Sequence, residues 1–111
     1  MTRAFIYLTK FLDKWDNLGM SDDNLLQLER HLLENPNAGN VVRGTGGLRK
    51  LRWKLPETGK SGGIRIAYID VVVSEKLYML DLFPKTEKDN YSSTERNILK
   101  QLINDLKNEG A

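Results

Sequence analysis

Residues 48–69 read LRKLRWKLPETGKSGGIRIAYI and contain two runs with the alternation of β-strands, joined by a segment rich in turn residues. Successive side chains of a strand point to opposite faces, so the first run has one apolar and one cationic face. The cationic face is formed by Lys50, Arg52 and Lys54. The intervening segment 56–63, PETGKSGG, has the composition of a turn. The stretch therefore predicts a β-hairpin in which Arg65 of the second strand can share that cationic face.

Two helices are predicted on the N-terminal side of this hairpin. Leucines recur with helical spacing over residues 22–34, Ser21 is a suitable N-cap, and an Asn-Pro pair at 35–36 ends the pattern. Residues 8–18 also have apolar side chains at helical spacing. The apolar residues 5–7 can form a short edge strand that leads into this first helix.

One strand and one helix are predicted after the hairpin. In residues 77–83 we expect one core face, formed by Tyr78, Leu80 and Leu82, with Met79, Asp81 and Phe83 on the other. Ser92 and Glu95 match the Ser-x-x-Glu capping box of a helix that runs to about Asn108. The order β-α-α-β-β-β-α predicts an α+β fold, in which a small antiparallel sheet has the helices packed on one face and its cationic face partly free.

Length and composition exclude several classes of protein. At 111 residues we expect one domain, 1–111, with one functional site. The chain has no cysteine, which excludes disulfides, thiolate nucleophiles and cysteine-based zinc sites and suits a cytoplasmic location. No apolar run approaches the length that spans a bilayer, so we expect no membrane partner.

Positive charge is concentrated in the predicted hairpin. Residues 43–65 contain seven basic residues and one acid, a local balance of +6. Because the whole chain carries +2, the remainder carries −4. A polarised surface of this kind indicates a polyanion binder, and the plain alternative is a solvated charged hairpin without a function.

Other chemistries have little support in the sequence. The one histidine, His31, lies in the leucine-rich helix, where a structural role is expected. No group of acids and histidine has metal-ligand spacing, so we predict no metal. The glycine-rich segments 44–47 and 59–63 do not have phosphate-loop spacing, and we predict no cofactor.

The cationic face can nevertheless bind and cut RNA. Cations neutralise phosphates, and an exposed aromatic such as Phe83 can stack on an unpaired base, a combination suited to single-stranded RNA. RNA supplies its own nucleophile, the 2′-hydroxyl. A site without metal or histidine can therefore cut RNA if arginine stabilises the added charge and a lysine crowded by other cations acts as general base.

Two blocks of sequence resemble the RelE/HigB branch of the RelE/ParE toxin superfamily. They are GTGGLRKLRW with GKSGGIRIAY, within residues 44–68, and LFPKTEKD at 82–89. The LLENP helix end at 32–36 and the closing Ser-x-x-Glu helix extend the resemblance over nearly the whole chain. It implies the RelE fold and the toxin of a type II toxin-antitoxin system, a metal-independent endoribonuclease that inhibits translation by cutting mRNA in the ribosomal A site. The implied partners are mRNA, the ribosome and a cognate antitoxin, with DNA contacted only through the toxin-antitoxin complex.

The resemblance also implies roles for individual residues. The implied catalytic residues are Lys50, Arg52, Arg65 and Lys85. The implied RNA-binding residues are Arg49, Lys54, Lys60, Phe83 and Tyr91. Thr86 stands near the position where the family often has an arginine, and the aromatic of the family falls on Phe83 or Tyr91, which leaves the general acid unassigned.

Two alternatives compete with the ribonuclease. The ParE branch shares the architecture but poisons gyrase without cutting RNA, so the fold alone does not decide the activity. Double-stranded RNA-binding modules also have an α-β-β-β-α core, although their lysines usually lie at the start of the last helix. Here residues 92–96 contain one cation, which ranks this alternative third.

Overall fold

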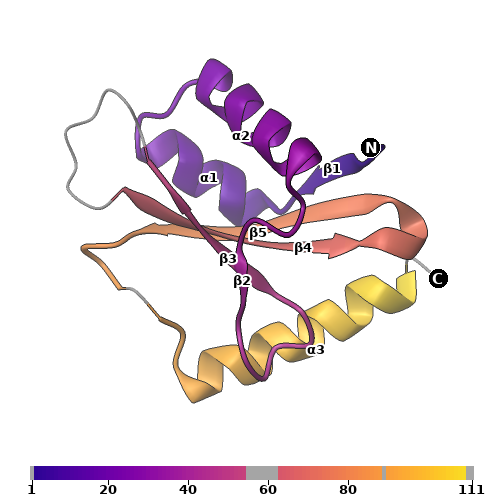
Figure 1. Cartoon of the computed structure of the whole chain (residues 1–111). Helices are drawn as coiled ribbons and strands as arrows, with labels where there is room; N and C mark the ends of the chain where they lie inside the picture. The colour runs from indigo at the N-terminus through magenta and orange to yellow at the C-terminus, as the bar shows by residue number, and fades with distance from the viewer. Residues whose placement is uncertain (1, 55–62, 89, 110–111) are drawn as a thin grey trace.

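The part of the chain that the structure describes forms a five-stranded sheet with three α-helices (Figure 1). The computed structural model describes residues 2–54, 63–88 and 90–109. The elements are β1 (Ala4–Tyr7), α1 (Thr9–Asn17), α2 (Asp22–Glu34), β2 (Asn40–Val41), β3 (Arg49–Trp53), β4 (Ile64–Val71), a 3-10 turn (Val72–Ser74), β5 (Lys76–Pro84) and α3 (Ser93–Glu109). The strand order is β1-β5-β4-β3-β2. The predicted α+β class is confirmed.

The sheet is mixed, where an antiparallel sheet was expected. β1 pairs in parallel with β5, while β5, β4, β3 and β2 pair antiparallel. α1 and α2 lie between β1 and the next strand in the sequence. The alternation of side chains along a strand carries no information about strand direction, so the parallel pairing could not be predicted from it. The short strand β2 was not predicted, because its two residues are too few to show a period.

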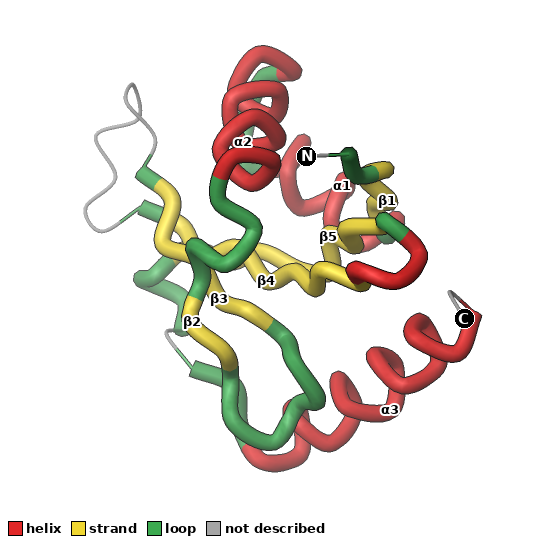
Figure 2. The backbone as a smooth tube through the Cα atoms, turned by 45° about the vertical axis from the view of Figure 1, so that its right-hand side comes forward, coloured by secondary structure: helices red, strands yellow, loops and turns green. Residues whose placement is uncertain are grey.

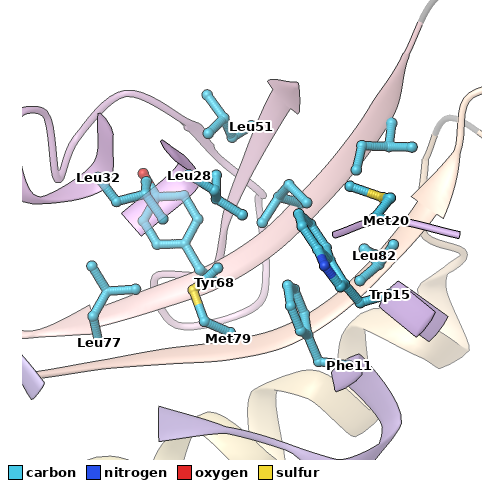
Figure 3. Packing of buried hydrophobic residues seen from close by; sticks show 12 residues of the cluster. Phe11, Trp15, Met20, Leu28, Leu32, Leu51, Tyr68, Leu77, Met79 and Leu82 are labelled. Atoms are coloured by element: carbon cyan, nitrogen blue, oxygen red, sulfur yellow. The ribbon is translucent and has the colours of Figure 1, made fainter. Parts of the chain in front are cut away.

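The helices cover both faces of the sheet, so the expectation of one helical face and one partly free face was wrong. Figure 2 shows α1 and α2 on one side and α3 on the other. β4 and β5 are buried on both faces along nearly their whole length, and such strands need a layer on each side. The α1/α2 side contains the larger cluster, with Phe11, Trp15, Leu28, Leu32, Tyr68 and Met79 (Figure 3). The α3 side contains Ile69, Leu80, Phe83, Ile103 and Leu106.

A β-bulge in β5 changes which residues share a face. Ala67 pairs with Asp81 while the next residue, Tyr68, pairs with Met79, so Leu80 is the extra residue. Such an insertion shifts the alternation beyond it to the other face. Tyr78 and Leu80 consequently lie in the α3-side cluster and Leu82 in the α1/α2-side cluster, against the expectation of one shared face.

Local signals for the helices are confirmed. α2 occupies the predicted residues, and the Ser21 hydroxyl accepts the Asn24 amide at 3.1 Å. At the start of α3 the Ser92 hydroxyl accepts the Glu95 amide at 3.2 Å, and the Glu95 carboxylate accepts the Ser92 amide at 2.9 Å, which completes the predicted capping box. A search of the described ranges finds no helix long and apolar enough to cross a membrane.

Candidate functional site

The β3–β4 hairpin brings three of the predicted site residues to one face. Lys50 pairs with Ala67, and Arg52 pairs with Arg65. Directly opposed residues of antiparallel strands point to the same side, so all three cations lie on the face that α3 covers further along. The predicted sharing of a face by Arg65, Lys50 and Arg52 is confirmed.

These cations border a pocket of about 270 Å³, which we call the hairpin pocket. Its lining is formed by Ala38, Asn40, Lys50, Leu51, Arg52 and Arg65. Arg52 is exposed, Lys50 is half-buried and Arg65 is only 1 % exposed. A guanidinium stays charged in proteins, and partial burial strengthens its attraction for an anion. The described lining contains three cations and no acid, so the hairpin pocket favours an anion.

A second pocket, of about 390 Å³, adjoins the first, and we call it the helix pocket because the first turn of α3 forms part of it. Its lining is formed by Asn40, Val41, Val42, Arg43, Lys50, Asn90, Tyr91 and Arg96. Asn40 and Lys50 belong to both pockets. The Lys50 ammonium donates a hydrogen bond to the Asn90 side-chain oxygen at 2.8 Å, which holds it between the two.

Phe83 is not the exposed aromatic that the sequence predicted. It is 1 % exposed and packs edge-on against Tyr91, with 5.4 Å between ring centroids. The Lys88 ammonium lies 5.0 Å from the Phe83 centroid and 4.8 Å from that of Tyr91. Phe83 lies directly opposite Arg65, on the cationic face where it was expected, and it is buried because Tyr91 and the α3-side cluster cover this part of the face. This burial leaves no open ring face at Phe83 on which a base can stack.

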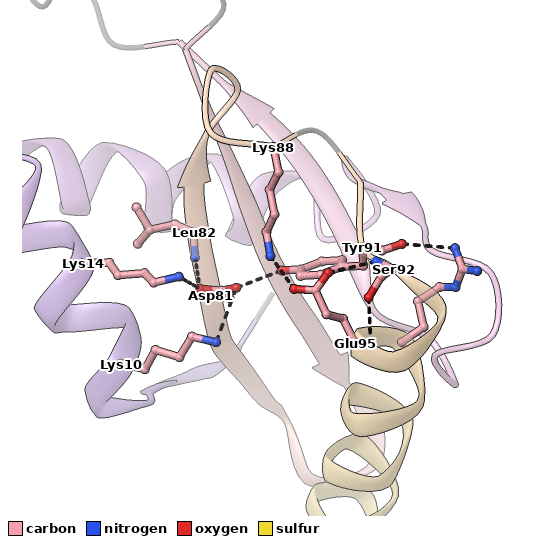
Figure 4. A network of polar contacts seen from close by, with 9 residues as sticks. Lys10, Lys14, Asp81, Leu82, Lys88, Tyr91, Ser92 and Glu95 are labelled. Carbon is pink, nitrogen blue, oxygen red and sulfur yellow. Dashed lines mark hydrogen bonds and ion pairs between the residues drawn. The ribbon is translucent and has the colours of Figure 1, made fainter.

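Tyr91 belongs to a buried polar network (Figure 4). Its hydroxyl donates to Asp81 at 3.1 Å, and Asp81 also pairs with Lys14 at 2.7 Å and Lys10 at 3.6 Å, both from α1. Burial, followed by the charge of Asp81, raises the pKa of Tyr91 well above its ordinary value of 10. The phenol therefore stays protonated at neutral pH and acts as a hydrogen-bond donor.

Three further predicted site residues, the RNA-binding candidates Arg49 and Lys54 and the catalytic candidate Lys85, are not among the described residues that line the two pockets. Arg49 lies opposite Tyr68 on the α1/α2 face, where its guanidinium donates to the Gly39 carbonyl at 2.7 Å. Lys54 and Lys85 are exposed and are not among the described residues that line either pocket. Lys60 lies outside the described residues.

Among the described residues, His31 makes a packing contact and the acids form no metal-binding group. The His31 ring packs against Trp53 with 5.3 Å between centroids, on the α1/α2 side of the sheet. Within the part of the chain that the structure describes, no three His, Cys, Asp or Glu side chains gather as metal ligands. The cationic pockets are therefore the candidate site.

Sequence reasoning missed part of this site. It did not single out Asn40, Arg43, Asn90 or Arg96. Arg43 was counted in the basic segment, which was the available signal, but nothing in the sequence relates Lys50 to Asn90, which is 40 residues away. These contacts depend on where α3 and the segment before it pack against the sheet, which is a long-range feature of the fold.

The comparisons with known proteins concern the fold. No protein-family model matches the sequence. A mutant of the Escherichia coli toxin RelE in the free state matches with a TM-score of 0.56 and 18 % identity, over 79 % of this chain and 88 % of that chain. The intact E. coli RelBE toxin-antitoxin complex matches with a TM-score of 0.51 and 20 % identity, over 74 % of this chain and 94 % of that chain. At this identity the likeness establishes the architecture: the chain has the fold of the RelE toxin, which confirms at the level of the fold the resemblance found in its sequence.

Proposed function

We propose that this chain is the toxin of a type II toxin-antitoxin system and acts in the cytoplasm as a metal-independent endoribonuclease that cuts mRNA in the ribosomal A site. The observation that carries the proposal is the hairpin pocket, in which Lys50, Arg52 and Arg65 meet. The fold supports it, because the E. coli toxin RelE has the same architecture. The solved RelBE toxin-antitoxin complex supports a cognate antitoxin as partner.

The proposed reaction is an in-line transfer at one phosphate. The 2′-hydroxyl oxygen attacks the adjacent phosphorus and loses its proton to a general base. The candidate base is Lys50, which accepts this proton as the neutral amine and becomes the ammonium. The bond from phosphorus to the 5′-oxygen of the next nucleotide breaks, and that oxygen takes a proton from a cationic side chain or from solvent. The products are a 2′,3′-cyclic phosphate and a 5′-hydroxyl.

The pocket has the charges that this transition state requires. Negative charge grows on the non-bridging oxygens of the phosphate, and fixed donors aimed at them stabilise it. Arg52 and Arg65 are directly opposite one another across the hairpin, so the two guanidiniums can contact one phosphate. Arg65 has little freedom to move because it is buried, which reduces the entropy lost on binding.

The test is primer-extension mapping of transcripts after brief induction. Wild type is compared with Arg52→Ala, which removes an exposed side chain, and with Arg30→Ala, which removes an exposed arginine of α2 outside both pocket linings. We expect cuts inside translated codons for wild type and Arg30→Ala, and none for Arg52→Ala. Growth arrest without cuts would contradict the proposal and point to a gyrase-directed toxin, and RNA binding without cuts or arrest would point to a non-catalytic RNA-binding module.

A further inference from the structure

The helix pocket has features of a binding site that the cleavage scheme does not use. Arg43 follows β2 and Arg96 lies in the first turn of α3, and both line this pocket together with Lys50. The cations come from three separate segments of the chain. Its described lining contains no acid, so the pocket concentrates positive charge.

Arg96 is held in place for binding. Its guanidinium donates to the Tyr91 carbonyl at 3.3 Å and to the Ser93 hydroxyl at 3.2 Å. A guanidinium has five N–H donors, so these two bonds fix its plane and leave donor capacity for an anion. The Tyr91 hydroxyl donates a hydrogen bond to Asp81 of β5, so the segment that holds Arg96 is bonded to the sheet.

The two pockets adjoin at Lys50 and Asn40, which line both. A strand of RNA carries one charge per nucleotide, so a phosphate bound in the hairpin pocket has a charged neighbour that must lie nearby. Val41 and Val42 line the helix pocket beside its cations, and such apolar side chains suit the sugar of a nucleotide.

We propose that the helix pocket is a second phosphate subsite, in which Arg43 and Arg96 bind the backbone of single-stranded RNA next to the phosphate cut in the hairpin pocket. This inference rests on the proposed function, because it assumes that RNA occupies the hairpin pocket. An acidic protein segment is the competing ligand. RNA is favoured because the cations continue across two adjoining pockets, as the regular charge of a nucleic-acid backbone requires.

The experiment measures binding of the whole chain to a fluorescent single-stranded RNA by anisotropy at several salt concentrations. Every ribose carries a 2′-O-methyl group, so the 2′-oxygen cannot attack and binding is separated from cleavage. The variants are Arg43→Gln and Arg96→Gln, with Arg96→Lys to restore the charge and Arg30→Gln as the matched control on α2. Thermal melting confirms that each variant is folded.

We expect Arg43→Gln and Arg96→Gln each to reduce the magnitude of the slope of log K, the RNA association constant, against log salt concentration by about 0.7. This is the value for one phosphate contact on a single strand. Arg96→Lys should recover that slope, and Arg30→Gln should keep it. Unchanged slopes in Arg43→Gln and Arg96→Gln would overturn the inference. The inference would also be overturned if the two glutamine variants changed the salt slope for binding of an oligoglutamate but not for binding of the RNA. That result would assign the pocket to an acidic protein segment.

Failure of the phosphate subsite can be distinguished from failure of the proposed ribonuclease function. Wild type that binds the methylated RNA with the expected slopes but makes no cuts on ribosomes would keep the subsite and refute the ribonuclease. Cuts that persist while the pocket variants bind RNA like wild type would refute the subsite alone.

Discussion

The network around Asp81 gives the sharpest prediction for stability. Asp81 is 3 % exposed and accepts from Tyr91 and Lys14, and its carboxylate also accepts its neighbour's amide, that of Leu82, at 2.9 Å. Asp81→Ala removes the carboxylate and leaves the Tyr91 hydroxyl without this partner. Tyr91→Phe removes the hydroxyl and leaves Asp81 with its two lysines. The two changes break the same hydrogen bond, but only Asp81→Ala also removes the partner of the two lysines.

The magnitudes follow from what each change leaves behind. A hydrogen bond to a charged group contributes about 1.5–3 kcal/mol, which is the expected cost of Tyr91→Phe. Removing one partner of a buried charge network costs about 3–5 kcal/mol, which is the expected cost of Asp81→Ala, reduced because Lys14 is partly exposed. In urea, these costs lower the unfolding midpoint by on the order of 1 M for Tyr91→Phe and more for Asp81→Ala.

Tryptophan fluorescence measures this unfolding, because Trp15 is 1 % exposed and reports on the α1/α2-side core. The double variant completes a thermodynamic cycle, and Tyr91→Phe should cost less once Asp81 is alanine. A cost below 0.5 kcal/mol for Asp81→Ala, roughly that of an ordinary surface change, would refute the reasoning. Equal costs of Tyr91→Phe with and without Asp81 would refute it as well.

Three further predictions concern stability and are measured by the same urea unfolding. Gly63→Ala should cost on the order of 1–3 kcal/mol, because Gly63 has φ +64° and an added Cβ would lie 2.4 Å from the Trp53 carbonyl oxygen. Arg49→Gln should cost about 1–2 kcal/mol through its lost bond to the Gly39 carbonyl, with the RNA salt slope unchanged. Wild type should lose stability as pH rises above 10, since the raised pKa of Tyr91 favours the neutral phenol only in the folded state, and Tyr91→Phe should lose less.

Much of the fold was predictable because its signals are local. The helix spanning 22–34 and the capping box of Ser92 and Glu95 depend on residues within one or two turns of each other. The shared face of Arg52 and Arg65 was equally accessible, since the period of two along each strand limits the ways in which a hairpin can pair.

The rest depends on contacts between distant segments. The parallel pairing of β1 with β5 and the docking of α3 on the second face leave no local pattern. The bulge at Leu80 interrupts a regular alternation, which is why Tyr78 and Leu80 lie on the opposite face from Leu82. Phe83 was expected at the surface and is buried because Tyr91, from the segment before α3, packs against it. The helix pocket, where Arg96 approaches the hairpin, is hidden from the sequence for the same reason.

Whether this chain is a ribosome-dependent ribonuclease is decided by the RNA ends that it produces on purified ribosomes programmed with a defined mRNA. The account predicts cuts at the A-site codon with 2′,3′-cyclic phosphate and 5′-hydroxyl ends. It also predicts a rate that falls about a hundredfold or more in Arg52→Ala, the cost of losing one charge-stabilising donor, and stays unchanged in Arg30→Ala. Ends with a 5′-phosphate and a 3′-hydroxyl, or equal rates in wild type and Arg52→Ala, would contradict it.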